Sequence, residues 1–214
     1  MSSKKYISLP HDYLSHSQMQ LWISDPEKYK KLYFDNRDDL RTSNSGQKFG
    51  KEVADALEAN RDTGDILTDA AMLLLPKHDT RDQSFIVEFK EKNGQWLKII
   101  IKPDMYNSVS HSFRENKTGK QPWTQSKAQK HPQMIFYAVG IWIKTGTMNT
   151  NAYLDYVETE DTPLGIKPTG RVESFEVTFK PEDYYEFQAK MLKVAHEIEE
   201  SWAAHITPEY ISTF

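Results

Sequence analysis

The stretch SFIVEFKEKNGQWLKIIIKPDMYN, residues 84–107, contains two β-rich runs on either side of Lys92-Asn93-Gly94. Asn-Gly between runs of β-branched and aromatic residues is a strong signal for a β-hairpin. We therefore predict that a sheet begins here and that its second strand ends at Ile101-Lys102-Pro103-Asp104. A third short strand, SFRENK at 112–117, follows after a loop.

Helical patterns surround these strands, since apolar residues recur at helical spacing before and after them. Helices are predicted at 15–35 with a break at Asp25-Pro26, from Gly46 to 60, at 65–76, at 132–144 and at 181–205, and two further strands near 151–159 and 171–179. A central mixed β-sheet flanked by helices is typical of an α/β or mixed α+β fold. Without a repeat or a flexible linker, residues 1–214 are predicted to form a single domain.

Composition excludes several classes of function. The 214 residues are 38% hydrophobic and carry a net charge of −4, so the bulk charge does not indicate a nucleic-acid-binding protein. The absence of cysteine excludes disulfides, thiolate catalysis and cysteine-ligated metal, so any metal must be held by oxygen or imidazole. No run of about 18 uncharged apolar residues occurs, and the N-terminus lacks a secretory apolar core. We expect no membrane partner and a cytoplasmic protein.

The most informative residues are Asp104, at the end of the second strand, and Glu115-Asn116-Lys117 on the next strand. Because strand side chains alternate between faces, Glu115 and Lys117 point the same way and Asn116 points the other way. Carboxylates on adjacent strands can bind Mg²⁺ or Mn²⁺, and a nearby lysine can orient or deprotonate water. The alternative is a strand-end turn residue at Asp104 beside a solvated Glu115–Lys117 pair on an edge strand.

These residues belong to an ordered series of motifs that resembles the PD-(D/E)XK nuclease superfamily, in its RecB-like branch with the Q-x-x-x-Y motif. The series comprises Leu14-Ser15-His16-Ser17-Gln18, Asp25-Pro26-Glu27-Lys28-Tyr29, the helix from Phe49 to Glu58, Pro103-Asp104, Glu115-Asn116-Lys117, Thr118-Gly119, Trp123 and Gln133-Met134-Ile135-Phe136-Tyr137. The resemblance extends from about residue 6 to residue 206. It implies a restriction-endonuclease-like core.

The resemblance also implies roles for single residues. Asp104 and Glu115 would bind Mg²⁺ or Mn²⁺ together with the backbone carbonyl of Asn116, and Lys117 would position or activate the attacking water. Gln133 and Tyr137 lie four residues apart on a helix, so they share a face and can reach DNA or the lysine together. The alternative for these two is a polar helix start and a core tyrosine.

One position departs from the family pattern. Where many relatives carry a histidine or a glutamate as a further metal ligand, this chain has Ala54. Glu58 lies one turn further along the same helical face and is our candidate for the missing ligand. A solvated charge at Glu58, and a site with fewer protein ligands, are the alternatives.

Residues 117–131 are locally basic in an acidic chain, which suits contact with phosphates. The predicted DNA-binding residues are Lys120, Trp123, Lys127 and Lys130, besides Gln133 and Tyr137. Trp123 offers a surface for base stacking. The alternative is a solvated loop with Trp123 folded onto the core.

Together these features predict a Mg²⁺- or Mn²⁺-dependent deoxyribonuclease, with exonuclease action favoured, in DNA recombination, repair or phage-type DNA processing. DNA is the expected partner, and a helicase or recombinase is a candidate to deliver the enzyme to it. The absent ligand at Ala54 motivates an alternative, a catalytically inactive nucleic-acid-binding or scaffold protein on the same fold. A ribonuclease or a restriction-type endonuclease is a third interpretation.

Overall fold

The computed structural model describes residues 4–41, 45–59, 62–76, 84–148 and 151–207. The helices of these ranges are α1 (His16–Ser24), α2 (Pro26–Tyr33), the 3₁₀ turn η1 (Asp38–Leu40), α3 (Ser45–Ala59), α4 (Ile66–Leu74), α5 (Gln125–Gln129), α6 (Pro132–Thr145) and α7 (Pro181–Ile206). The strands are β1 (Leu14–Ser15), β2 (Phe85–Lys90), β3 (Trp96–Ile101), β4 (Met105–Tyr106), β5 (Phe113–Gly119), β6 (Ala152–Thr162) and β7 (Gly165–Val177). The predicted mixed α/β fold is confirmed. In these ranges no helix combines the length and the apolar character that a membrane crossing requires.

The strands form two hydrogen-bonded sheets where we expected a single central sheet. One sheet has the order β1-β3-β2, and the other has the order β4-β5-β6-β7. The predicted hairpin joins β2 and β3 in antiparallel register, and Gly94 in its turn has a φ of 94°. The chain leaves the first sheet at residues 102–104, where Pro103 has no N–H to continue the ladder. This break separates β3 from β4 and creates the second sheet.

Short elements account for the other differences from the sequence prediction. β1 and β4 contain two residues each and α5 contains five, which is too short for a periodic pattern to develop. β6 and β7 are longer than predicted and meet in a turn that ends at Gly165, where φ is 122°. The pairing of β5 with β6 is parallel and places Glu115 opposite Leu154 and Lys117 opposite Tyr156. β5 is therefore an interior strand.

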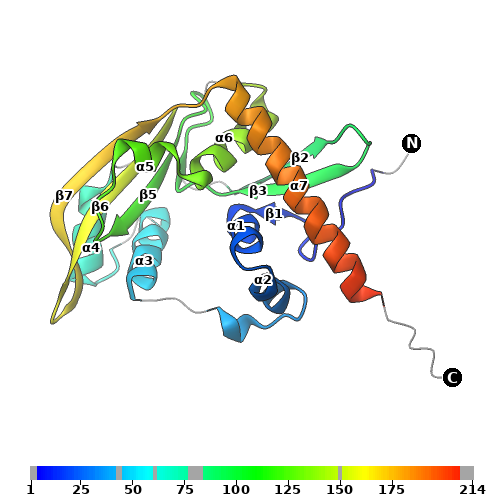
Figure 1. The fold of residues 1–214 in the computed structure, drawn as a ribbon. Coiled ribbons are helices and arrows are strands. Elements are labelled where there is room, and N and C mark those ends of the chain that lie inside the picture. The colour runs from blue at the N-terminus through cyan, green and yellow to red at the C-terminus, as the bar shows by residue number, and fades with distance from the viewer. Residues whose placement is uncertain (1–3, 42–44, 60–61, 77–83, 149–150, 208–214) are drawn as a thin grey trace.

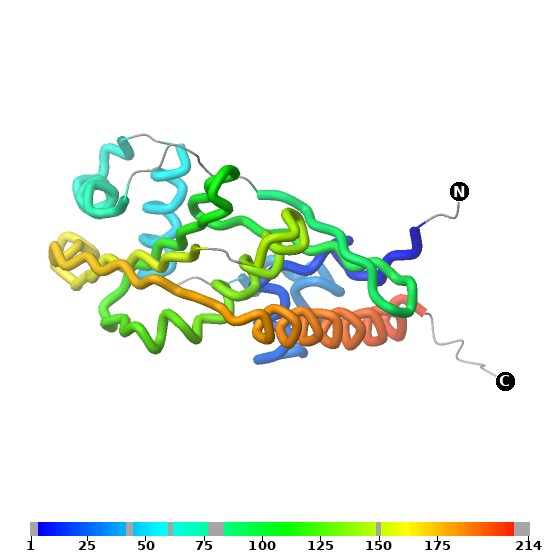
Figure 2. The backbone as a smooth tube through the Cα atoms, turned by 90° about the horizontal axis from the view of Figure 1, so that it is seen from above, coloured from blue at the N-terminus to red at the C-terminus, as the bar shows by residue number. Residues whose placement is uncertain are grey.

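Helices cover both sheets. Figure 1 shows the long α7 running across α6 and past α1, while α4 lies behind the strongly curved strands β6 and β7 and α3 stands beside β5. Seen from above in Figure 2, α3 and α4 lie on one side of the β4–β7 sheet and the segment containing α5 lies on the other. α6 packs against β2 and β3 and contacts α7 on its other side. The largest fully buried side chains of this core include Leu97, Ile99, Ile101, Met134, Phe136 and Ile141.

Side-chain caps fix the starts of the first two helices. Ser15 Oγ accepts a hydrogen bond from the Gln18 backbone N–H at 3.2 Å, and Gln18 Oε1 accepts one from the Ser15 N–H at 2.7 Å. This capping box starts α1. Asp25 caps α2 through the Lys28 N–H at 3.0 Å, and Pro26 occupies the first helical position. The chain therefore bends between the two helices.

Close packing of α6 on β3 depends on Gly140. A Cβ atom added there would lie 2.6 Å from Ile101 Cγ2 and 3.4 Å from Ile99 Cδ1, and both isoleucines are fully buried. Gly140→Ala should therefore lower the free energy of unfolding by about 1–3 kcal/mol, the usual cost of overpacking a core. Urea titration measures this loss.

Gly119→Ala is the matched control, because its added Cβ would meet Tyr156 at an ordinary 3.8 Å. Its stability should stay close to that of the wild type. Equal stability of Gly140→Ala and Gly119→Ala would contradict the tight α6–β3 contact.

Candidate functional site

A cleft of about 500 Å³ lies between α3 and β5, beside the break that follows β3. Its lining residues are Gly46, Gln47, Gly50, Val53, Ala54, Asp104, Glu115, Asn116, Lys117 and Thr118. We call it the acidic cleft. It brings together the residues that the sequence singled out from two separate stretches, Asp104 and Glu115-Asn116-Lys117.

Asp104 lies close to β5, but not at the end of β3 as we expected. It lies outside β3, in the break before β4, and β4 pairs with β5 only through Met105 and Tyr106. Beyond this short pairing, Asp104 Oδ2 accepts a hydrogen bond from the Asn116 backbone N–H at 2.6 Å. The N–H and C=O of a strand residue point to the same side, so the Asn116 carbonyl faces this edge as well.

Glu115 is the buried acid of the cleft. It is 3% exposed, and its Oε1 accepts a hydrogen bond from Lys117 Nζ at 2.6 Å. The second oxygen, Oε2, is buried and has no hydrogen-bond partner among the described residues. A buried carboxylate oxygen without a donor is costly unless a cation compensates it.

Lys117 connects this acid to α6. Its Nζ also donates a hydrogen bond to Gln133 Oε1 at 2.9 Å, and Gln133 Nε2 donates to Tyr137 Oη at 2.8 Å. Glu115 and Lys117 therefore share a face of β5, and Gln133 and Tyr137 share a face of α6, as the two periodicities predict. The glutamine reaches the lysine directly, and the tyrosine supports the glutamine.

These residues fit a hard divalent cation held by oxygen. The unpartnered Glu115 Oε2, the Asp104 carboxylate and the Asn116 carbonyl converge on the acidic cleft, and Mg²⁺ typically takes one or two carboxylates and keeps several waters. In the described part of the chain, no three His, Asp or Glu side chains gather closely enough to hold a metal by themselves. Two carboxylates plus water is thus the ligand set that this geometry offers.

The Ala54 position lies in the acidic cleft, but the proposed substitute for it does not. Ala54 lines the cleft, whereas Glu58 is absent from its wall and accepts a hydrogen bond from Lys102 Nζ at 3.3 Å. Lys102 is two residues from Asp104, so Glu58 lies near the rim of the site. Its role as a metal ligand stays a prediction.

Two histidines that we did not single out as site residues flank Lys117. The rings of His16 and His131 lie 6.3 Å apart, and the rings of His131 and Trp123 lie 5.2 Å apart. Burial lowers the pKa of His16 to about 4, assisted by His131 and Lys117. Burial, with Lys117 and Lys127, lowers the pKa of His131 to about 4 as well. Both imidazoles are therefore neutral at pH 7.

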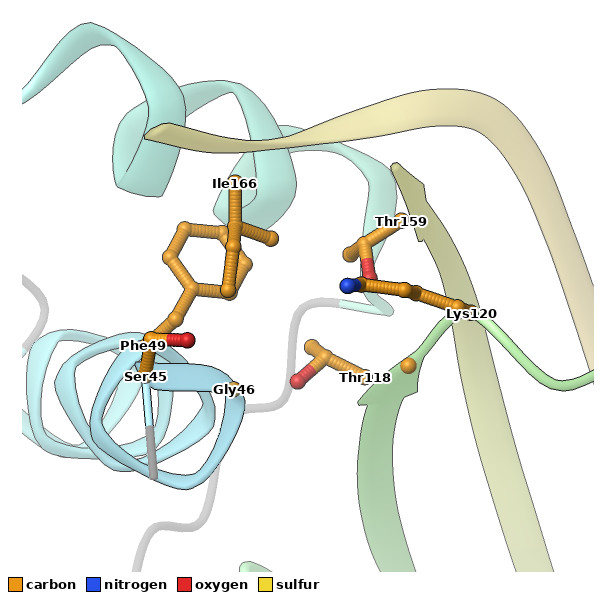
Figure 3. A pocket seen from close by; sticks show the side chains of 8 residues that line it. Ser45, Gly46, Phe49, Thr118, Lys120, Thr159 and Ile166 are labelled. Carbon is orange, nitrogen blue, oxygen red and sulfur yellow. The ribbon is translucent and has the colours of Figure 1, made fainter. Parts of the chain in front are cut away.

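Lys120 lines a second cleft, of about 440 Å³, that adjoins the acidic cleft and shares Gly46 and Thr118 with it. Figure 3 shows the Lys120 side chain extending from the end of β5 into the space between the sheet and α3, beside Thr159. Its Nζ forms an ion pair with Asp161 on β6. We call this the lysine cleft. The lysine cleft continues from the acidic cleft, and its wall contains the Lys120 ammonium group and several hydroxyl groups.

The other predicted DNA contacts lie elsewhere. Trp123 is partly buried against the core, and Lys127 Nζ lies over its ring at 4.3 Å. The tryptophan is therefore folded onto the core, as the alternative interpretation held, with a lysine on its ring. Lys130 lines a separate cleft of about 590 Å³ between α6 and α7, together with Asp183 and Glu186. The structure thus brings Lys120 to the cleft that adjoins the acidic cleft, whereas Lys130 lies in a cleft that shares no residue with it.

Comparisons with known proteins leave the family open. No family model matches the chain. No curated protein matches it either. One similar solved structure is described as the crystal structure of SSO0001; it is 12% identical, and the match covers 86% of this chain and 76% of that chain with a TM-score of 0.45. A likeness this weak carries no argument about function, which must come from the site itself.

The buried histidines give the protein a predictable pH dependence. Both have a folded-state pKa below the usual 6.5, so the unfolded chain binds protons more readily between pH 6.5 and 4. The stability that the neutral imidazoles contribute is complete above pH 6.5 and is lost as the pH falls through that window. The free energy of unfolding should drop by at most about 1.4 kcal/mol per pH unit for each histidine.

Urea titrations between pH 7.5 and 4 measure this slope. His131→Gln should flatten it, because the substitution removes one of the two buried imidazoles. An unaltered slope in His131→Gln would refute the effect.

Proposed function

We propose that this chain is a Mg²⁺- or Mn²⁺-dependent deoxyribonuclease that hydrolyses phosphodiester bonds in the acidic cleft. The observation that carries the proposal is the convergence of Asp104, Glu115 and Lys117 on one cleft, with a buried Glu115 oxygen that has no donor among the described residues. The resemblance of the ordered motifs to PD-(D/E)XK nucleases supports the same reading. Exonuclease action is our first choice, in recombination, repair or phage-type DNA processing.

The residues of the cleft have separate tasks in this proposal. Asp104 and Glu115 would hold the cation, which when bound supplies charge stabilisation at the scissile phosphate. Lys117 Nζ, fixed between Glu115 and Gln133, would orient the attacking water on the side of the cleft that faces α6. Gln133 keeps the ammonium group in place, because its own amide is held by Tyr137. The ammonium group is therefore already in position before the substrate binds.

The neighbourhood of the cleft supports a polyanionic substrate. The lysine cleft continues from the acidic cleft and contains Lys120 with the hydroxyl groups of Ser45, Thr118 and Thr159. Lysines and hydroxyl groups are common phosphate contacts in complexes with nucleic acids. A strand in the acidic cleft could therefore place a neighbouring phosphate beside Lys120. DNA is the partner we propose, and a helicase or recombinase could deliver it.

A catalytically inactive DNA-binding or scaffold protein is the second candidate. It is favoured by Ala54, which lies in the wall of the acidic cleft where the resemblance leads us to expect a ligand. Such a protein would bind DNA in chelator and would cleave no substrate with any divalent ion.

The decisive experiment compares the wild type with Asp104→Asn and Glu115→Gln. End-labelled single- and double-stranded DNA, closed circles and RNA are incubated in Mg²⁺, Mn²⁺ or chelator. We expect metal-dependent cleavage by the wild type and a loss of at least about a hundredfold in both variants, because each removes a charge that holds the cation. Glu182→Gln, exposed at the start of α7, is the matched control and should cleave normally.

The substrate panel separates the remaining interpretations. Sparing of circles would indicate an exonuclease, and cleavage of circles or RNA would indicate a restriction-type endonuclease or a ribonuclease. Full activity of Asp104→Asn would eliminate the assigned site, and no cleavage by the wild type would favour the inactive protein.

Lys117→Met tests the role of the lysine separately from the cation. We expect cleavage to slow by about 10²–10⁴, the usual contribution of a positioned acid or base, while calorimetry still detects Mn²⁺ binding. Lys193→Met on α7 is the control, since its side chain is 77% exposed. Loss of Mn²⁺ binding in Lys117→Met would show that the lysine serves the metal site and not the water.

A further inference from the structure

A fourth cleft, of about 350 Å³, lies on the other side of the Lys117–Gln133 contact. Its wall is formed by the loop before α1, the first turn of α1, the end of α2, Arg41, β3 with Lys102, and α6. We call it the tyrosine cleft after Tyr13 and Tyr33, which line it. Gln133 lines this cleft and also bonds Lys117 in the acidic cleft, so the two clefts are neighbours.

The chemistry of the tyrosine cleft is opposite to that of the acidic cleft. Its described lining residues include two cationic side chains, Arg41 and Lys102, and no aspartate or glutamate, although the chain has a net charge of −4. Both cations keep more than half of their side chains exposed, at 53% and 55%, and each pairs with an acid that does not line the cleft, Asp38 and Glu58 respectively. The cleft is therefore suited to an anionic group.

Arg41 is held in an orientation that suits a phosphate. Its guanidinium carbon lies 5.4 Å from the centre of the Tyr33 ring, and its Nε donates a hydrogen bond to Asp38 at 2.8 Å. The guanidinium has further N–H donors beyond the one that this bond uses, and two of them can bind a phosphate side by side. Cation–π stacking and one ion pair thus position the group before a ligand arrives.

Aromatic rings stand opposite this cation. The His11 ring meets the Tyr33 ring edge-on at 5.1 Å and lies 6.5 Å from the Tyr13 ring. Asp12 between them has a φ of 57°, a left-handed conformation that aspartate tolerates better than most residues. The Tyr33 ring lies 4.6 Å from the Tyr29 ring, and the Arg41 guanidinium lies over it. Because Tyr33 already has these contacts, we assign base stacking to Tyr13 and His11.

The volume of the tyrosine cleft limits the size of the ligand that it can hold. A volume of about 350 Å³ lies at the lower end of ligand pockets, which leaves room for one base and its phosphate but not for a stacked base pair. A base can enter between aromatic side chains only when it is unpaired. A duplex would have to open its end before a nucleotide could occupy the cleft.

We infer that the tyrosine cleft binds the nucleotide next to the scissile phosphate of a single DNA strand, with its phosphate at Arg41 and Lys102 and its base against Tyr13. This assignment rests on the proposed nuclease function and adds a strand preference to it. The strand passes from the tyrosine cleft through the acidic cleft toward Lys120. Discrimination between single strands and duplexes then lies in the loop before α1 and at the end of α2, outside the catalytic residues.

The test measures binding and cleavage separately. Fluorescence anisotropy with labelled oligothymidylate of about 12 nucleotides, in chelator, gives dissociation constants without turnover. Arg41→Gln should weaken binding about three- to tenfold and reduce the salt slope by about 0.7, the value for one phosphate contact with a single strand. Arg37→Gln is the matched control, because Arg37 lies in the same loop, pairs with Asp39 and does not line the cleft.

The aromatic contact has its own variant. Tyr13→Leu should weaken single-strand binding about tenfold and leave binding of a blunt duplex unchanged, since only an unpaired base reaches the ring. Tyr185→Leu, with an exposed tyrosine on α7, is the control. Thermal melting confirms that each variant is folded.

The outcomes distinguish this inference from the proposed function. Cleavage by the wild type with equal binding by Arg41→Gln and Arg37→Gln would overturn the subsite and leave the nuclease intact. Binding that depends on Arg41 and Tyr13 without any cleavage would overturn the nuclease and leave the subsite intact. A wild type that neither binds nor cleaves DNA would overturn both.

Discussion

The contact between Glu115 and Lys117 is the interaction on which the rest of the site depends. A carboxylate that is 3% exposed requires a cation, and the residue two positions along the same strand face supplies it at 2.6 Å. The same ammonium group binds Gln133, so the charge pair joins β5 to the start of α6. Only one Glu115 oxygen is satisfied in this way among the described residues. In the proposed function, the second oxygen is a ligand of the metal ion.

An incomplete sheet edge explains why this pair is accessible at all. β5 lies between β4 and β6, but β4 has only two residues, so no strand of the described ranges pairs with that edge of β5 beyond Arg114. Asp104 and α3 line the space that a longer strand would have filled, and the Asn116 N–H binds the Asp104 carboxylate in place of a strand carbonyl. Extending β4 would close the cleft. A short strand therefore creates the site.

Tertiary packing also gives the three clefts different charged residues, although Lys120, Arg41 and Lys102 are each paired with an acid. Acidic groups gather in one cleft, whereas Lys120 lies in the cleft on one side of it and Arg41 and Lys102 lie in the cleft on the other. A net charge of −4 is thus compatible with a path for a polyanion through the three clefts. His16, beside Lys117, stays uncharged at neutral pH because burial lowers its pKa to about 4. Our proposal of a nucleic-acid substrate therefore rests on the placement of charges and not on the total charge.

The sequence by itself determined the elements and the faces within them. The Asn93-Gly94 turn gave the hairpin, strand alternation placed Glu115 beside Lys117, and helical spacing placed Gln133 beside Tyr137, because backbone geometry alone fixes these local periods. Only the tertiary structure decided the division into two sheets, the distance of Glu58 from the acidic cleft and the meeting of Tyr13, Tyr33 and Arg41. Such contacts join residues far apart in the chain, and close packing of side chains selects them without leaving a periodic trace in the sequence.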